Sequence, residues 1–592
     1  MDKPFVSYPF SAQRFEARVP ALQGGTDVQR HAVVIVGGGP VGMATALGLA
    51  KQGVASVVLE ADDSVCFGSR AICVARRSLE ILNRLGVARG FMQTGLPWTG
   101  GRSFYRGQEV LRFAMPQDDN QQFPPMLNMA QYSIEQHLLD GLAEHADLID
   151  VRWQSHVRGL TVTEDGAHVV VSTPQCDYAL DADWLVACDG GRSFVRESMG
   201  LKLEGTSYEG RYVIVDILMA SERQAERLAY FDPPCNPGST VLVHKQPGNV
   251  WRIDYQLRDG EDPDEAILPE NVMPRVASLL EMMGETAEWN PIWTGIYKAN
   301  ALTLARYRHG RVMFAGDAAH LVPIFGVRGF NSGIDDADNL SWKLAGVVRG
   351  FAHETLLDSY SLERVAATRE NLSYGTKSTE FMAPPSFAFE LMRHAVLSLA
   401  AAHPGLSSLI NPRQSAPIAY TDSPLNGADL GFDDGPQPGT VLPEAPLTRV
   451  ARAHSSAQGT GAQPSAGHLT DLLTCDFTVM VLSQNGEVAA EWSERIAAHN
   501  RAGWAVQLVV IAAECPLEGV GAGVTSLAWD HTGQVMRLLG ACAGSVYVIR
   551  PDGHVLARAQ AAGVGWALAQ ISRTLGVAAA EPADHPISAT RA

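Results

Sequence analysis

The first strongly apolar run of the chain, residues 32–36, is followed by glycines and then by a helix-like segment at 41–52. A short unbroken apolar run bounded by glycine predicts a buried strand of the kind found in parallel sheets. A second such run, residues 56–59, leads into Glu60. Strand, glycine turn, helix and strand in this order predict the first unit of a doubly wound α/β sheet.

The pattern changes twice further along the chain. Predicted strands and helices alternate from residue 31 to about 200, after which residues 212–217, 240–244 and 250–255 read as antiparallel strands. Residues 311–315 then read as a strand and 334–348 as a helix, so the first domain is expected to resume there. The sheet between 201 and 300 is therefore predicted to be an insertion that walls a substrate site.

The C-terminal part has an α/β pattern of its own. Its predicted strands lie at 477–482, 505–511, 545–550 and 554–557, and a small-residue stretch at 455–467 predicts a flexible linker before them. The predicted organisation is an N-terminal leader, a first domain in two parts, an inserted domain, a helical segment with the linker, and a C-terminal domain. These segments are 1–30, 31–200 with 301–385, 201–300, 386–467 and 468–592.

The glycines after the first strand match the spacing of a dinucleotide-binding turn. Gly37 permits the tight turn, Gly39 lets the backbone approach a pyrophosphate, and Gly42 lets the helix pack closely on the strand. Pro40 belongs to the same turn and is assigned to the cofactor with these glycines, and the N-terminal end of the helix that follows favours phosphate. Glu60 stands where a ribose hydroxyl would be bound. The alternative interpretation is an ordinary strand-to-helix turn.

A second glycine-rich segment indicates FAD rather than a nicotinamide dinucleotide alone. An extended FAD needs a second, distant loop, because its ribityl chain and ring lie far from its adenosine end. Gly316 and Asp317 follow the predicted strand, and the Asp317 carboxylate can accept hydrogen bonds from ribityl hydroxyls. Backbone amides ahead of the predicted helix can stabilise negative charge on the flavin pyrimidine edge. The residues of this loop assigned to the cofactor are Pro323, Gly329, Asn331 and Gly333.

Three motifs together resemble the FAD-dependent aromatic hydroxylases, the single-component flavoprotein monooxygenases related to phenol hydroxylase and 3-(3-hydroxyphenyl)propionate hydroxylase. They are the first glycine turn, the sequence ACDGGRSFVR at 187–196, and Gly316-Asp317 with the sequence that follows through residue 343. The resemblance implies an enzyme that takes electrons from NADH or NADPH, forms a flavin C4a-hydroperoxide with O2, and hydroxylates a small phenolic or aromatic substrate. The fold class implied is α/β: a Rossmann-like FAD-binding domain with an inserted α+β substrate domain and a thioredoxin-like C-terminal domain.

The same resemblance assigns further residues to the cofactor. Asp189 and Gly190 would lie near the flavin pyrophosphate and the path of the nicotinamide, the alternative being a strand-to-turn junction held by an Asp–Arg pair. Arg70 and Arg77 would face the flavin phosphates, with a solvated surface arginine as the alternative for Arg77, and Gln131 would lie near the ribityl chain. The C-terminal domain has no redox dithiol, so it is expected to be a scaffold or dimer contact whose removal spares flavin binding. A homodimer is therefore expected.

Charge and cysteine usage narrow the function. With 46 Lys and Arg against 64 Asp and Glu, the formal net charge of −18 argues against a nucleic-acid partner, and an anionic substrate would need a local basic group. The 8 cysteines form no CxxC pair and no zinc spacing, so no metal is expected and a reducing compartment is indicated. No apolar run approaches the roughly 20 residues that cross a bilayer, and no signal-peptide core is evident. No membrane partner is expected, and the predicted location is cytoplasmic.

Candidate catalytic side chains come from the predicted antiparallel strands. By strand parity His244 and Gln246 share one face, and Arg252 and Asp254 share a face of the next strand. If these faces wall the substrate, Arg252 could approach the flavin or an anionic substrate, and His244 or Asp254 could accept the phenol proton. Tyr230 is a further hydrogen-bond candidate. The alternatives are a structural Arg–Asp pair and a packed histidine.

Other flavoprotein classes are alternatives. An oxygenase of ketones or alkenes uses the same flavin and O2 without a phenol. A flavin disulfide reductase needs a closely spaced redox pair, and Cys66 and Cys73 do not have that spacing. A flavin halogenase would carry a WxWxIP sequence, which is absent. His320 is expected to pack beside the flavin loop rather than act as a base.

Overall fold

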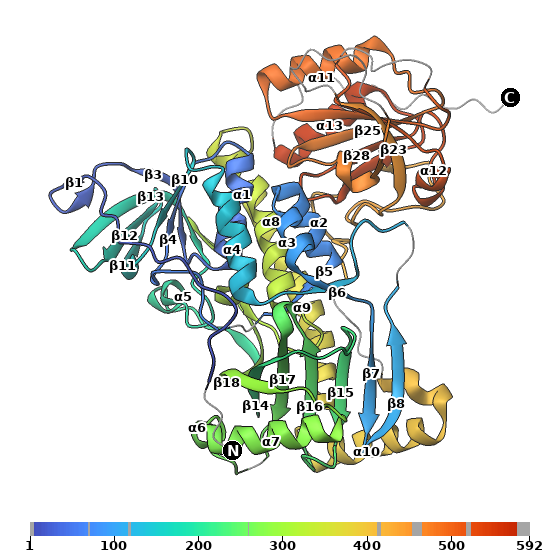
Figure 1. The fold of residues 1–592 in the computed structure, drawn as a ribbon. Coiled ribbons are helices and arrows are strands. Elements are labelled where there is room, and N and C mark those ends of the chain that lie inside the picture. The colour runs from blue at the N-terminus through green and yellow to red at the C-terminus, as the bar shows by residue number, and fades with distance from the viewer. Residues whose placement is uncertain are drawn as a thin grey trace.

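The computed structural model describes residues 5–68, 71–116, 120–258, 260–410, 416–452, 464–516 and 523–576. Arg70 and most of the predicted linker at 455–467 lie outside these residues. Figure 1 shows a doubly wound sheet with its helices, a second sheet below it and a C-terminal α/β unit above it.

The first sheet has ten strands, and the apolar runs form its centre. Four strands run parallel there: β3 (His31–Val36), β4 (Ser56–Leu59), β13 (Asp177–Ala187) and β20 (Val312–Phe314). The other strands are β1 (Leu22–Gln23), β2 (Thr26–Asp27), β10 (Ile149–Arg152), β11 (His156–Val162), β12 (Ala167–Ser172) and β19 (Arg308–His309). The predicted first unit and the return of the chain to this sheet after residue 300 are both confirmed.

Helix α1 (Pro40–Lys51) packs against α4 (Gln131–Ala143) and α8 (Gly329–Val348). Helix α8 begins ahead of the predicted residue 334, so Asn331 and Gly333 lie inside the helix rather than in a loop. Gly333 lets α8 approach α1 closely, because a Cβ on it would lie 2.5 Å from Val41 Cγ2 of α1. The remaining helices of these two sheets are α2 (Arg76–Leu85), α3 (Ala88–Thr94), α5 (Phe194–Ser198), α6 (Pro263–Ala266), α7 (Pro269–Met282), α9 (Leu356–Met382) and α10 (Phe387–Ala402).

The second sheet has eight strands in the order β21–β18–β14–β17–β16–β15–β7–β8. Their bounds in that order are His320–Leu321, Trp289–Thr303, Glu204–Met219, Val250–Gln256, Thr240–Lys245, Arg227–Phe231, Gly100–Tyr105 and Gln108–Ala114. The three predicted antiparallel strands are confirmed within β14, β16 and β17. Strands β7 and β8 come from the part of the chain assigned by pattern to the first domain, yet β7 pairs with β15 (Figure 1). Alternation of side chains in a hairpin does not determine which sheet edge the hairpin joins.

A small third sheet connects the first two. It consists of β5 (Cys73–Ala75), β9 (Met126–Asn128) and β6 (Leu96–Trp98). Asn128 donates from Nδ2 to the Lys245 carbonyl of the second sheet at 2.8 Å. On the other side, the Ala75 amide donates to Asn331 Oδ1 of α8 at 2.8 Å. The small sheet therefore ties the start of α8 to the second sheet.

The C-terminal sheet has the order β22–β29–β28–β25–β26–β27–β23–β24. Its strands in that order are Asp429–Leu430, Val555–Ala559, Val546–Ile549, Phe477–Ser483, Val506–Ala512, Ser526–Trp529, Pro446–Arg452 and Ser465–His468. Helices α11 (Ala490–Ala502), α12 (Gln534–Leu538) and α13 (Val564–Leu575) accompany it. The four predicted strands are confirmed, but the sheet also takes β22, β23 and β24 from the segment predicted as helix and linker. The thioredoxin-like resemblance stays a prediction.

Buried contacts join the C-terminal unit to the first domain. Arg550 donates from Nη1 and Nη2 to the two carboxylate oxygens of Glu363 in α9, at 2.7 and 2.9 Å. Lys343 of α8 donates to the same carboxylate at 2.7 Å. Trp342 beside it packs against Phe477, with ring centroids 5.6 Å apart. These contacts argue against the expectation that the C-terminal domain can be removed without affecting the flavin-binding part.

No helix in the described part of the chain is both long enough and apolar enough to cross a membrane.

Candidate active site

The motif residues that are far apart in sequence meet at one edge of the first sheet. In the register of the parallel strands, Leu59 lies beside Val36, Val36 beside Ala187, and Ala187 beside Phe314. These four residues are the carboxyl ends of their strands, which is where open α/β sheets bind ligands. The residues that follow them are the first glycine turn, Glu60, Asp189 and the Gly316–Asp317 turn.

Steric limits explain the glycines of the first turn. Gly37 has φ of 103°, and a Cβ on it would lie 2.4 Å from the Cys188 carbonyl oxygen. A Cβ on Gly42 would lie 2.0 Å from the Gly37 carbonyl oxygen. Gly39 precedes α1, with Pro40 at its first position, and no side chain caps this helix. No atom lies within 4 Å of the position a Gly39 Cβ would take, so the helix start is open to an anion.

Glu60 closes one side of this turn. Its carboxylate accepts from the Gly38 amide at 2.6 Å and from the Asp62 amide at 2.8 Å. Burial raises the pKa of Glu60, while these amide bonds oppose the rise. The side chain is therefore held beside the turn, where its role toward a ribose stays a prediction.

The second turn lies against the start of α1. A Cβ on Gly316, at φ of 60°, would lie 2.9 Å from Val41 Cγ2. Asp317 in the same 3₁₀ turn, Gly316–Ala318, is exposed at this edge of the sheet. The N-terminus of α8 also lacks a side-chain cap, and Gly329 has open space around it. Two uncapped helix starts and an exposed carboxylate fit the two ends of an extended FAD.

Asp336 anchors the second turn, and sequence analysis did not identify it. Its Oδ2 accepts from the Gly316 amide at 3.0 Å and lies 2.6 Å from His320 Nε2, while its Oδ1 accepts from Arg364 at 2.6 Å. Asp336 and His320 are both fully buried. His320 therefore packs beside the flavin loop, as expected, on strand β21 rather than at a helix start.

The remaining cofactor candidates differ in how well their surroundings suit a ligand. Asp189 caps α5 by accepting from the Val195 amide at 3.0 Å, and its buried Oδ1 has no hydrogen-bond partner among the described residues. Gly190 has φ of 76° and open space around it. Gln131, at the start of α4, accepts from the Ala71 amide at 3.3 Å. Pro323 lies against Gly375 of α9. Their contacts with a cofactor stay predictions.

The polar atoms of two candidates form hydrogen bonds or ion pairs with other residues of the protein. Asn331 accepts from the Ala75 amide and the Ser78 hydroxyl and donates to the Cys73 and Val327 carbonyls. Arg77 is buried, faces Glu80, Asp335 and Asp338, and donates to the Asp552 carbonyl of the C-terminal unit at 2.6 Å. Arg77 is thus neither a solvated surface residue nor placed toward the sheet edge. A cluster of acidic side chains holds it against the C-terminal hairpin instead.

One face of the second sheet carries a buried row of polar side chains. Arg227 of β15 lies opposite His244 of β16 because Leu228 pairs with Val243, and His244 lies opposite Arg252, which lies opposite Asp216. Directly opposed residues share a face. Asp254, two positions from Arg252, and Gln246, two from His244, share it too. We call these six residues the polar face; the opposite face is apolar and packs on α7.

The predicted parity of His244, Gln246, Arg252 and Asp254 is therefore confirmed. Tyr230 does not join them, because it belongs to the apolar cluster on the α7 side and stacks on Phe104 with ring centroids 4.9 Å apart. Successive side chains of a strand point to opposite faces, so Tyr230 lies on the face opposite to that of Ala229 and Phe231.

Arg252 is held by a carboxylate other than the one next to it in sequence. It donates from Nε and Nη2 to the two oxygens of Asp216, both at 2.8 Å. The Tyr8 hydroxyl of the N-terminal leader donates to the same carboxylate at 2.7 Å. The expected structural pair thus exists, but its acid is Asp216. This leaves Asp254 without a hydrogen bond or ion pair among the described residues.

Burial shifts the pKa values of Asp254 and His244 in opposite directions. Burial raises the pKa of Asp254 to about 7, although Arg252 and Arg227 oppose the rise. Burial lowers the pKa of His244 to about 3, and the charges of Arg227 and Arg252 add to the effect. Near neutral pH, Asp254 is therefore a base of suitable strength, whereas His244 is a neutral hydrogen-bonding group.

Next to Asp254 the polar face becomes apolar. Leu242 lies opposite Asp254, and Ala229 lies opposite Leu242. Tyr212 on the same face contacts Phe325, at 5.2 Å between ring centroids, and Phe325 lies in the loop that precedes α8. Trp98 lies near the polar part of this face, with its ring centroid 6.4 Å from that of His244. Apolar surface beside a buried carboxylate suits an aromatic ring that carries a hydroxyl group.

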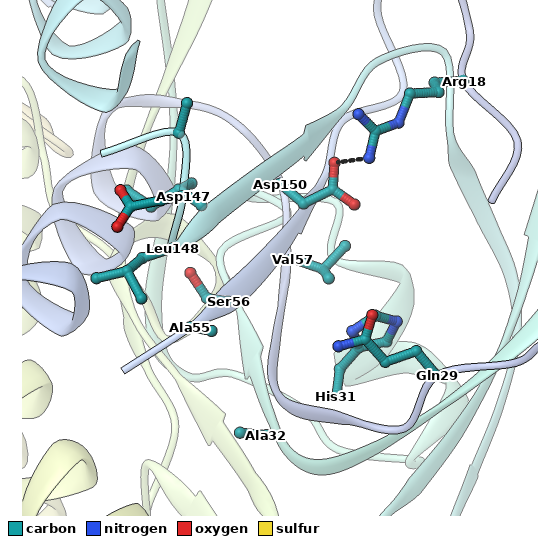
Figure 2. Close-up of a pocket in the computed structure, with 12 residues that line it drawn as sticks. Arg18, Gln29, His31, Ala32, Ala55, Ser56, Val57, Asp147, Leu148 and Asp150 are labelled. Atoms are coloured by element: carbon teal, nitrogen blue, oxygen red, sulfur yellow. Dashed lines mark hydrogen bonds and ion pairs between the residues drawn. The ribbon is translucent and has the colours of Figure 1, made fainter. Parts of the chain in front are cut away.

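Two hollows lie away from the polar face. One of about 250 Å³ is lined by His31, Ser56 and Ile149, the first residues of β3, β4 and β10, and so lies at the amino-end edge of the first sheet. Figure 2 shows it, with Arg18 paired to Asp150 at 2.9 Å. The other, of about 910 Å³, is lined by residues of the small sheet, Arg328, α9 and the segment 440–444. Among the described residues, no group of His, Cys, Asp and Glu is arranged to hold a metal ion.

The strand ends and the two open helix starts suit an extended dinucleotide, and the polar face places buried polar groups next to apolar surface. The chain belongs to the FAD binding domain family, whose model matches residues 30–373. It is an FAD-dependent monooxygenase of the aromatic hydroxylase type, as the motifs predicted.

Similar proteins include a hydroxylase, a monooxygenase and a solved structure with FAD bound. A 3-(3-hydroxy-phenyl)propionate/3-hydroxycinnamic acid hydroxylase from Mycolicibacterium gilvum is 30% identical over 393 residues, which cover 66% of this chain and 67% of that protein. A 6-methylpretetramide 4-monooxygenase from Streptomyces rimosus is 28% identical over 545 residues, or 90% and 91% of the two chains. The solved structure of the flavin-dependent monooxygenase PieE with FAD and substrate has a TM-score of 0.72 at 22% identity, covering 93% of this chain and 99% of that one.

Proposed function

We propose that this protein uses NADH or NADPH and O2 to hydroxylate a phenolic aromatic compound that binds between the polar face and the loop before α8. The observation that supports this most is Asp254, a buried carboxylate with a pKa of about 7 and no hydrogen bond within the described protein. It stands at the boundary between the polar row and the apolar surface of Leu242 and Phe325. No other carboxylate on this face is without a partner, because Asp216 is committed to Arg252.

The residues at the sheet edge would hold FAD, which when bound supplies the activation of O2 after reduction by the nicotinamide. Gly39 and the start of α1 would face the pyrophosphate, and Glu60 the ribose. Asp317 would accept from the ribityl hydroxyls, and the backbone amides at the start of α8 would face the pyrimidine edge. The small sheet links the cofactor site to the substrate site, because Asn331 joins this sheet to α8.

Asp254 would accept the phenol proton. Ionised Asp254 takes that proton onto a carboxylate oxygen and leaves the ring as an electron-rich phenolate, the form that reacts with an electrophilic oxygen. Burial keeps water from this carboxylate, and neutral His244 can donate a hydrogen bond to the ring oxygen. The base is about half ionised at pH 7, so hydroxylation is expected to rise with pH through about 7.

A cytoplasmic homodimer is part of the proposal. Among the described residues after the leader, helix α10 and the turn after it carry half of the large apolar side chains that are exposed. They include Phe387, Leu391, Met392, Leu399 and Leu406. An apolar stretch of this kind supports association of two copies.

The test is a panel of phenols, hydroxybenzoates and hydroxyphenylpropionates, with ketones and alkenes alongside. NADH and NADPH oxidation, hydrogen peroxide and hydroxylated product are measured together on the purified yellow protein. We expect at least one phenol to yield product in near-stoichiometric amount with the nicotinamide consumed. If every phenol yields only hydrogen peroxide while a ketone or alkene is oxygenated, the phenol assignment is wrong.

A further inference from the structure

Arg227 is a buried cation that forms no ion pair with any described residue. Only 6% of the residue is exposed, and among the described residues it has no ion pair and no hydrogen bond. Burial lowers the pKa of its guanidinium, and the Asp254 carboxylate, whose charge opposes this shift, forms no ion pair with it. A buried arginine is costly unless an anion and good acceptors surround it.

The neighbours of Arg227 are also short of partners. Gln246 is 1% exposed, and neither its amide nitrogen nor its amide oxygen has a partner among the described residues. The same holds for Nδ1 of His244, which lies directly opposite Arg227 in the sheet. Three buried side chains, one on β15, one on β16 and one just after β16, thus have polar atoms without partners among the described residues.

Charge balance indicates the sign of the missing group. Arg252 is neutralised by Asp216, which leaves Arg227 against Asp254. When Asp254 takes the phenol proton it loses its charge, and Arg227 then has no counter-charge in the described protein unless the substrate brings one. The net charge of −18 repels anions in general, so an acidic substrate needs a local cation of this kind.

We propose that Arg227 is the anion anchor of the substrate site and that the substrate is an aromatic acid. This inference rests on the proposed function and adds the class of substrate to it. The substrate carboxylate accepts from the Arg227 guanidinium, with Gln246 beside it, while the ring extends over Leu242 and its hydroxyl group reaches Asp254. By strand spacing, the Cα atoms of Arg227 and Asp254 lie roughly 12 Å apart, a span that one ring with a short acid chain can bridge.

The test compares acids with neutral isosteres. Dissociation constants are measured by calorimetry on the flavin-loaded protein for 3-hydroxybenzoate and 3-(3-hydroxyphenyl)propionate, each against its primary amide. We expect the wild type to bind at least one acid about 10- to 100-fold more tightly than the amide, the range of a charge-assisted hydrogen bond. In Arg227→Met the preference should fall below about threefold through weaker binding of the acid, and Arg227→Lys should keep part of it.

Arg102→Met is the matched control. Arg102 lies on the next strand but one position out of step, pairs with Glu226 and is partly exposed, so its loss removes a positive charge from the other face. The acid preference should not change. If Arg227→Met does not retain FAD, the wild-type comparison and Arg227→Lys still decide the question.

Several outcomes would overturn the anchor. A wild type that binds no acid more tightly than its amide, or an Arg227→Met variant that keeps the preference, contradicts it. If neutral phenols are hydroxylated in either case, the proposed function survives the loss of the anchor. If no phenol is hydroxylated while ketones are, the proposed function fails independently.

Discussion

Replacing Asp254 with asparagine should abolish coupled hydroxylation and yet stabilise the protein. The carboxylate is the proposed proton acceptor, and loss of a positioned base costs about 10²- to 10⁴-fold in rate. Flavin reduction by the nicotinamide should persist, so NAD(P)H oxidation is expected to yield hydrogen peroxide instead of product. The residual rate should also lose the rise with pH through about 7 that the wild type shows.

The stability change follows from the same pKa. Folding raises the pKa of Asp254 from 3.8 to about 7, so the native protein holds this proton more tightly than the unfolded chain does. For such a group, stability is fully present below pH 4 and is lost as the pH rises from about 4 to 7. The difference corresponds to at most about 4 kcal/mol. Asparagine carries no charge, so the variant should gain on the wild type across this window.

The assay is urea unfolding of the flavin-loaded protein at pH 5, 6 and 7.5, together with product yield. Asp216→Asn is the contrasting control, because it removes the partner of buried Arg252 and should destabilise the fold by about 3–5 kcal/mol. An Asp254→Asn variant that hydroxylates normally would exclude Asp254 as the base. A variant no more stable at pH 7.5 than at pH 5, relative to the wild type, would refute the argument from burial.

Four further predictions concern the cofactor edge, the C-terminal unit and assembly. Asp317→Ala should lose most of its FAD on purification because a ribityl acceptor is removed; full yellow occupancy would contradict the assignment. Gly333→Ala should weaken FAD retention, since its Cβ would lie 2.5 Å from Val41 Cγ2, and Val41→Ala should restore it because the Val41 Cβ is 3.8 Å away; a double variant as poor as the single would disprove the contact. Glu363→Gln should cost about 3–5 kcal/mol in urea unfolding, because Arg550 and Lys343 would share no buried carboxylate there; an unchanged midpoint would count against it. Leu391→Glu should shift the protein toward monomer in light scattering, and a monomeric wild type would remove the basis for a homodimer.

Local patterns were sufficient for the main strands of each sheet and for the faces of β16 and β17, but not for β7, β8 and β22–β24. Residues 240–244 and 250–255 alternate regularly, and a period of two decides which side chains share a face. The same parity, extended to residues 227–231, would have excluded Tyr230 and drawn attention to Arg227. The meeting of Val36, Leu59, Ala187 and Phe314 at one edge follows from the rule that parallel strands end together.

Contacts between distant segments could not be predicted from local sequence patterns. The close approach of α8 to α1 places Gly333 against Val41, and Asp335 and Asp338 hold Arg77. Both are packing facts between helices, for which a single sequence carries no periodic signal. The partner of Arg252 was likewise ambiguous, because Asp254 is adjacent in sequence whereas Asp216 is adjacent in the sheet.

The order in which the strand ends appear along the chain has a consequence for biosynthesis. Val36, Leu59 and Ala187 leave the ribosome well before Phe314. Every strand of the second sheet except β21 is also translated before Phe314. A nascent chain therefore cannot complete the edge that holds the cofactor until the inserted sheet has been made. Capture of the flavin should come late, after the substrate wall has had time to fold, and a prematurely terminated chain should emerge without the cofactor.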